Sequence, residues 1–173
     1  MTTEAELNEA FEYAKHAGAP MIIGVPAPAL LPLLEKRVKE YNIKVAIHNH
    51  GPEDPIFPTP QSVYDKIKML DKRIGLCIDI GHVIRMPLDP AEQVLKYSDR
   101  LMDMHLRDVH APVKDGKTLE IGRGIIDFPK LFKAMIKIKY TGVAALEIEK
   151  DELDPMPAIS ESIGYARGML AMV

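Results

Sequence analysis

Short apolar runs alternate along the chain with segments in which apolar residues recur every three or four positions. The runs are typical of buried strands, and the wider spacing is typical of amphipathic helices. The apolar runs that we interpret as strands are 21–25, 45–47, 74–80, 101–106 and 143–148. The segments that we interpret as helices are 3–18, 29–41, 59–70, 89–98, 128–136 and 159–170.

This order, one helix followed by five strand–helix repeats, predicts an α/β fold. Strands that alternate with amphipathic helices lie parallel and are joined by right-handed crossovers. The chain has 173 residues, which is enough for one well-buried core and too few for two large domains. We therefore expect residues 1–173 to form a single domain.

Composition excludes several classes of protein. The net charge is −3 and aromatic residues make up 6%, so a nucleic-acid surface is not expected. The only cysteine, Cys77, cannot form an internal disulfide. No apolar stretch approaches the ~18 residues of a membrane span, and the first residues do not have the pattern of a secretory signal. We expect a cytoplasmic protein with no membrane partner.

Polar side chains gather where the predicted strands end. In parallel α/β folds, functional residues collect at the carboxyl ends of the strands. Four of the five predicted strands carry histidine or an acidic residue at or near that end. These residues are His48 and His50, Asp79 and His82, His105, and Glu147. We expect them to converge at one pole of a barrel.

Imidazole and carboxylate together suit a divalent first-row metal such as Mn²⁺, Zn²⁺, Co²⁺ or Fe²⁺. Each residue also has a plainer interpretation: Asp79 could cap a turn, His82 could orient Asp79, and His105 could be a hydrogen-bonded core residue. Glu147 is harder to explain in this way, because an unpaired carboxylate in an apolar strand is costly. The joint pattern favours one shared site.

Five segments in order resemble the xylose isomerase-like (β/α)8 barrel superfamily, in its sugar phosphate isomerase/epimerase branch. They cover nearly the whole chain. The segments are Ala46-Ile47-His48-Asn49-His50-Gly51, Cys77-Ile78-Asp79-Ile80-Gly81-His82, His105-Leu106-Arg107-Asp108, Gly122-Arg123-Gly124-Ile125-Ile126-Asp127 and Leu146-Glu147-Ile148-Glu149.

The resemblance implies one divalent metal and a small-molecule carbohydrate substrate. It makes Asp79 and His105 metal ligands, and Glu147 both a ligand and a proton-transfer residue. His82 matches a histidine that supports the ligands or contacts substrate. Arg107 and Arg123 would lie near the substrate, with ordinary surface charge as the alternative for both.

The sequence departs from the family at His48, which stands where members often have a ligand glutamate. We expect His48 to complete the ligand set, and His48 or His50 could also act as general base. Because the two are two residues apart, strand alternation points both to the same side. The sequence does not decide between them.

These features predict a metal-dependent isomerase or epimerase acting on a sugar, sugar phosphate or keto-sugar by proton transfer beside a metal-polarised carbonyl. One alternative is a keto-glycoside lyase or hydrolase, since the pair of glutamates is broken. A non-catalytic barrel fragment that binds sugar or metal is another. A DNA-repair endonuclease of the same superfamily is disfavoured by the net charge of −3.

Length conflicts with the family fold. A complete barrel has eight strands in typically ~250 residues, and this chain has five predicted strands in 173 residues. We expect a parallel-stranded TIM-type barrel of about five strand–helix units in which the N-terminal three are missing. The two open sheet edges and the uncovered interior lead us to expect a homo-oligomer that covers them, or a partner chain.

Overall fold

Five strands form one curved sheet in which every neighbouring pair is parallel. The computed structural model describes residues 1–151 and 153–172. The sheet order is β1-β2-β3-β4-β7. The strand bounds are Met21–Gly24 (β1), Lys44–His48 (β2), Ile74–Asp79 (β3), Leu101–Leu106 (β4) and Val143–Leu146 (β7). The five predicted parallel strands are confirmed.

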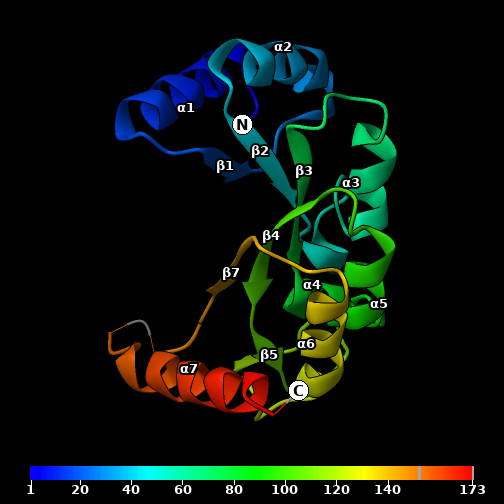
Figure 1. Cartoon of the computed structure of the whole chain (residues 1–173), viewed down its shortest axis with the longest axis vertical. Coiled ribbons are helices and arrows are strands. Elements are labelled where there is room, and N and C mark those ends of the chain that lie inside the picture. Colours follow the sequence, from blue (N-terminus) through cyan, green and yellow to red (C-terminus); the bar gives the residue numbers. More distant parts are fainter. Residues whose placement is uncertain (152, 173) are drawn as a thin grey trace.

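Helices follow the strands and cover the convex side of the sheet, so that the chain has the outline of a crescent (Figure 1). The α-helices are Glu4–Ala17 (α1), Leu31–Tyr41 (α2), Pro60–Ile67 (α3), Ile80–Arg85 (α4), Pro90–Lys96 (α5), Phe128–Lys137 (α6) and Met156–Leu170 (α7). One 3₁₀ turn, Pro28–Leu30 (η1), precedes α2, and another, Gly51–Glu53 (η2), follows β2. Three of these helices begin at a side-chain cap, since Thr3, Thr59 and Asp89 each accept a backbone hydrogen bond at the start of a helix.

Several predicted strand ends were wrong by one or two residues, since β1 ends at Gly24 and not at Val25, and β7 ends at Leu146 and not at Ile148. The third strand ends at Asp79 and not at Ile80, because the Asp79 side chain accepts a hydrogen bond from the His82 backbone N–H and begins the unpredicted helix α4. Between β4 and α6, where no strand was predicted, the chain also forms a small antiparallel ladder, which pairs β5 (Asp108–Val109) with β6 (Thr118–Leu119).

Alternation along the strands separates two faces of the sheet. Side chains such as Ile47, Leu76 and Met104 belong to the buried apolar core. Their neighbours in sequence include His48, Cys77 and His105, which belong to the opposite, concave face. The apolar core therefore lies between sheet and helices, and the polar residues line the inside of the barrel.

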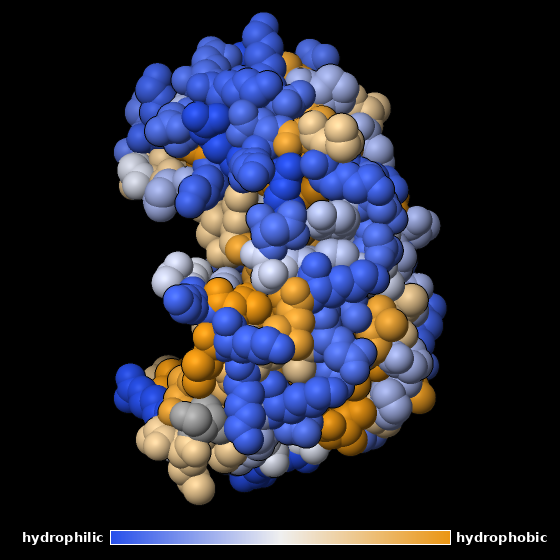
Figure 2. All heavy atoms as spheres, turned by 45° about the vertical axis from the view of Figure 1, so that its right-hand side comes forward, coloured by the Kyte–Doolittle hydropathy of each residue, from blue (hydrophilic) through white to orange (hydrophobic). Residues whose placement is uncertain are grey.

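The structure is an open half-barrel, as expected for an incomplete TIM-type barrel. Within residues 1–151 and 153–172, the edge strands β1 and β7 each pair on one side only. Apolar side chains remain uncovered there, with Ile23 41% and Val143 59% exposed. The space-filling view shows the hollow on the concave side, with apolar surface around its middle and lower parts (Figure 2). None of the described helices is both long and apolar enough to cross a membrane.

Candidate metal centre

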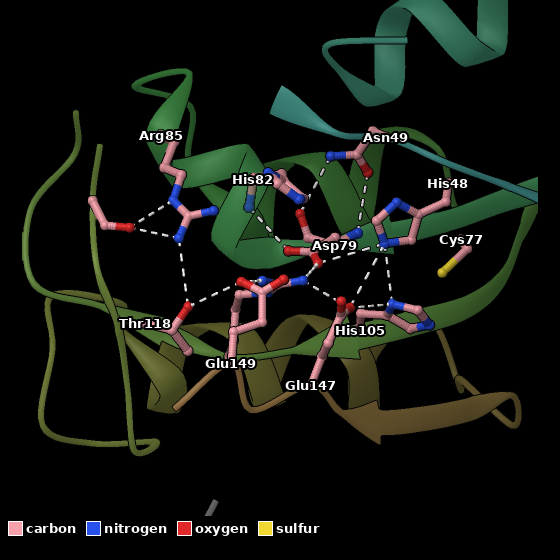
Figure 3. A network of polar contacts seen from close by, with 12 residues as sticks. His48, Asn49, Cys77, Asp79, His82, Arg85, His105, Thr118, Glu147 and Glu149 are labelled. Atoms are coloured by element: carbon pink, nitrogen blue, oxygen red, sulfur yellow. Dashed lines mark hydrogen bonds and ion pairs between the residues drawn. The ribbon is translucent and has the colours of Figure 1, made fainter. Parts of the chain in front are cut away.

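Strand register brings the predicted ligands together. Asp79, at the end of β3, pairs with His105 in β4, and His48 ends the neighbouring strand β2. Glu147 directly follows β7, and its backbone N–H donates to Leu106 of β4 at 3.0 Å. The four side chains come from four adjacent strands and point toward one another on the concave face (Figure 3).

The four side chains each offer a ligand atom, and these atoms all lie within 4.8 Å of one another. His48 Nε2 is 3.0 Å from His105 Nδ1, which is 2.6 Å from Glu147 Oε2. His48 Nε2 is also 3.5 Å from Asp79 Oδ2. Two imidazoles and two carboxylates fit a divalent first-row metal, because the carboxylates balance its charge and the set mixes nitrogen with oxygen donors.

Both carboxylates are held ionised. Burial raises the pKa of Asp79. The hydrogen bond with His48 and the charge of Arg107 lower it by more than burial raises it, so the net pKa lies below the ordinary value. The hydrogen bond with His105 and the charge of Arg107 outweigh burial and lower the pKa of Glu147. Ionised carboxylates are the form that coordinates a metal.

His105 shows the opposite shift. The hydrogen bond with Glu147 raises the pKa of His105 and outweighs the effect of burial. A metal requires a neutral imidazole, so metal binding at this site would compete with protonation of His105.

The wall of a cavity of about 210 Å³ includes His48, His50, His105 and Glu147. The His50 ring packs against that of His48, with 4.4 Å between ring centroids, but His50 does not belong to the four-residue ligand cluster. Burial lowers the pKa of His50, and the neighbouring His48 adds to that shift. The geometry therefore separates the two histidines: His48 lies among the candidate ligands, and His50 lies beside the cavity they share.

The three residues expected near substrate, His82, Arg107 and Arg123, do not line this cavity. Arg107 is completely buried behind the carboxylates, because its guanidinium bonds to Asp79, Glu147 and Glu149. Arg123 forms an exposed ion pair with Glu161 of α7, which places it in the surface-charge alternative.

His82 packs edge-on against His48, with 5.9 Å between ring centroids. Its backbone N–H donates to Asp79 Oδ1 at 2.9 Å. This backbone contact is the N-cap bond of α4, and the orienting role expected of the His82 side chain stays a prediction. Gly51 makes room for the ring, because a Cβ there would come within 2.9 Å of His82 Nδ1.

Asn49 and Asp103 contribute to the site although the sequence alone did not single them out. The Asn49 amide bonds to the backbone N–H and carbonyl of Asp79, at 3.1 and 3.3 Å, and fixes the end of β3 against β2. Asp103 lies two residues before His105 on the same face, where Cys77 Sγ donates to it at 3.4 Å. Strand alternation was the signal that could have found Asp103.

Cys77 forms a second possible cluster with His48 and His105. Burial and the charge of Asp103 raise the pKa of Cys77, so it remains a thiol. Because the thiolate is the ligand form, the carboxylate set is favoured over the cysteine set.

Comparison with known proteins finds a matching family, related sequences and similar structures. The sequence profile of the family described as xylose isomerase-like TIM barrel matches residues 5–169. An inosose dehydratase from Geobacillus kaustophilus (strain HTA426) is 26% identical over 145 residues, which are 75% of this chain and 45% of that protein. The chain thus spans less than half the length of the curated relatives it matches.

Solved structures share the fold. A D-tagatose 3-epimerase-like protein superposes with a TM-score of 0.82 at 23% identity, over 95% of this chain and 67% of that chain. The IolI protein, solved with a bound zinc atom, gives a TM-score of 0.82 at 18% identity, over 97% of this chain and 69% of that chain. At these identities the likeness shows the fold alone.

Proposed function

The chain belongs to the xylose isomerase-like TIM barrel family of sugar isomerases, epimerases and dehydratases, and from this premise we propose that it is a divalent-metal-dependent enzyme. The proposed substrate is a keto-carbohydrate, and the proposed reaction is proton transfer beside its carbonyl group. The observation that carries the proposal is the convergence of His48, Asp79, His105 and Glu147 within 4.8 Å.

These four residues would hold one divalent ion, with Mn²⁺, Zn²⁺, Co²⁺ and Fe²⁺ as the candidates. When bound, such an ion polarises a substrate carbonyl and acidifies the adjacent carbon. The IolI protein, which has the same fold, was solved with a bound zinc atom, and this supports a divalent metal as the ligand of the proposed site.

Two residues at the cavity are suited to move a proton. Glu147 has a side chain that is 35% exposed, and its ionised carboxylate can accept a proton from a substrate carbon. His50 lies in the same wall, and its lowered pKa keeps the imidazole neutral at pH 7, so it too can act as a base. The cavity thus offers one carboxylate, Glu147, and one imidazole, His50, so that one group can remove a proton and the other can return one.

Elimination is the second candidate outcome of the same proton abstraction. His48 stands where family members often have a ligand glutamate, so a symmetric pair of glutamates is not available for epimerisation. An inosose dehydratase among the relatives favours loss of water after proton abstraction. Isomerisation, epimerisation and elimination share the first proton abstraction and differ in their later steps.

Metal binding tests the first half of the proposal. We expect the purified chain to bind one equivalent of Co²⁺ or Zn²⁺ in a calorimetric titration, and His105→Ala and Glu147→Gln to weaken binding by about 10-fold or more. His16→Ala is the matched control, because His16 is an exposed histidine on α1. Wild-type protein without any bound metal would contradict the proposal.

Solvent deuterium exchange tests the second half without assuming a product. In D₂O with the metal present, we expect NMR to show deuterium at the carbon beside the carbonyl of inosose or D-tagatose, compounds named in similar proteins. A new double bond would identify elimination, and an altered configuration would identify epimerisation. Metal binding with neither exchange nor turnover would instead support the non-catalytic barrel fragment.

A further inference from the structure

We infer that Arg107, with Gly81 as its socket, is a positioning residue that holds the two candidate ligand carboxylates in place for the metal. This inference rests on the proposed function, because it concerns how the proposed metal centre is assembled. It differs from the expected role of Arg107 in binding substrate. Four observations carry it.

The first observation is the burial of a permanent charge. Arg107 is 0% exposed and is among the largest fully buried side chains of the described chain. Burying a guanidinium is costly unless hydrogen-bonded carboxylates compensate it. Such a residue has its position determined by its partners, and in turn it determines theirs.

The second observation is the identity of those partners. Arg107 Nη2 lies 2.6 Å from Asp79 Oδ2 and 2.7 Å from Glu147 Oε2, so one nitrogen bridges the two candidate ligand carboxylates. The other terminal nitrogen, Nη1, lies 2.5 Å from Glu149 Oε2. The planar guanidinium thus holds three carboxylates in fixed relative positions, a geometry that a lysine ammonium does not provide.

The third observation is the socket. A Cβ on Gly81 would lie 2.3 Å from Arg107 Cγ and 2.4 Å from Arg107 Cδ, so only glycine lets the arginine stem pass. Gly81 lies in the first turn of helix α4, and glycine favours the helix less than alanine does. The Asp79-Ile80-Gly81-His82 segment therefore supplies both a candidate ligand and the space for the residue that holds it.

The fourth observation is the charge balance. Three carboxylates around one guanidinium leave a formal charge of −2 when both histidines are neutral. A divalent cation neutralises that charge. Arg107 is therefore a complement to the metal and not a replacement for it, and it does not line the cavity that His48, His105 and Glu147 share.

Titration with Co²⁺ tests the inference, with calorimetry for affinity and visible absorption for ligand geometry. We expect Arg107→Lys and Gly81→Ala each to weaken Co²⁺ binding by about 10–100-fold and to change the absorption bands. Two matched controls, Arg100→Lys and Gly164→Ala, are expected to bind Co²⁺ within about threefold of wild type. Among residues 1–151 and 153–172, the buried Arg100 bonds only to backbone carbonyls, and a Cβ on Gly164 would meet nothing within 4 Å.

A double-mutant cycle distinguishes the effect of the space at Gly81 on Co²⁺ affinity from a general loss of stability. Arg107→Ala removes the atoms with which a Gly81 Cβ would clash, so Gly81→Ala should cause no further loss of affinity in that background. If Arg107→Ala does not fold, the comparison of Arg107→Lys and Gly81→Ala with their controls is still decisive, because both keep the buried charge.

The possible outcomes distinguish this inference from the proposed function. Unchanged or tighter Co²⁺ binding in folded Arg107→Lys and Gly81→Ala proteins would overturn the positioning role and leave the metal centre standing. A wild-type chain that binds no Co²⁺ would overturn both.

Discussion

His82 is a half-buried histidine next to the candidate ligands, and its partial burial lowers its pKa to about 4. In the unfolded chain a histidine titrates near its ordinary value of about 6.5. Between these two values the unfolded chain binds more protons than the folded one, so the free energy of unfolding falls as the pH falls through this window. Above about pH 6.5 this contribution is fully present.

His82→Asn should remove this dependence. Urea unfolding of both proteins at pH 7 and pH 5, with a chelator present, measures it. We expect the wild type to lose more stability than the variant over that interval. The raised pKa of His105 acts in the opposite direction but is common to both proteins, so it cancels in the comparison. An equal loss in the two proteins would contradict the assignment.

Asn49 supports the site through the backbone of Asp79. Its amide makes two buried hydrogen bonds to that residue, and the Asn49 side chain is fully buried. We expect Asn49→Ala to lower the free energy of unfolding by about 1–3 kcal/mol, because it leaves buried polar groups unpaired. Urea unfolding checks this value against Asn8→Ala, which removes a partly exposed hydrogen bond to Arg37. A loss no larger than that of the control would contradict this role.

Single residues differ in how far the sequence could predict them. His48, Asp79, His105 and Glu147 were predictable because each ends or follows an apolar strand, and parallel strands bring such ends together. The buried position of Arg107 was not predictable, since an arginine in a polar segment is usually solvated. Its burial depends on the space at Gly81 and on carboxylates distant in sequence.

At the scale of elements, Asp108 organises the segment that leads into α6. Its carboxylate accepts hydrogen bonds from the backbone N–H groups of Val109, Gly122, Gly124 and Ile126, at 2.8 to 3.2 Å. The Gly122-Arg123-Gly124 segment therefore wraps around a buried acidic side chain. The sequence indicated this segment only through family resemblance, with attention on Arg123.

Removal of that carboxylate should loosen the segment. We expect Asp108→Ala to accelerate amide exchange in peptides covering residues 120–127, because three backbone donors in this range lose their acceptor. Hydrogen–deuterium exchange followed by mass spectrometry measures this effect. Asp115→Ala, on the exposed turn between β5 and β6, is the control and should leave those peptides unchanged. Unchanged exchange in Asp108→Ala would show that other contacts hold the segment.

Helix α4 shows why element boundaries were harder to predict than element types. The run 74–80 is continuously apolar apart from Gly75 and Asp79, so its periodicity does not mark an end. The end is determined by a local competition, in which the Asp79 side chain bonds to the His82 backbone and starts a helix. The same contact places the carboxylate at the candidate metal centre.

At the scale of the whole molecule, the strand–helix alternation predicted the parallel sheet, and the family resemblance together with the chain length predicted that it forms a partial barrel. What covers the two sheet edges could not be predicted, because that depends on surfaces outside a single chain. The edges carry exposed apolar residues, including Ile23 on β1 and Val143 on β7.

We expect the chain to self-associate through these edges, because unpaired strands and exposed apolar surface favour contact with another chain. Size-exclusion chromatography with light scattering should give a mass above the 19.3 kDa of one chain. Val143→Lys on β7 should shift the population toward the monomer, whereas Met69→Lys, an exposed residue outside the edge strands, should not. A stable, well-folded monomer would contradict this expectation.

The central claim is that four strand ends form one divalent metal centre, and anomalous diffraction from a crystal soaked with Zn²⁺ tests it most directly. The account predicts a single strong peak about 2.0–2.2 Å from one donor atom each of His48, Asp79, His105 and Glu147. Arg107 should remain bonded to the two carboxylates beside the peak. A crystal with no peak among these four residues, or with zinc bound only elsewhere, would contradict the claim.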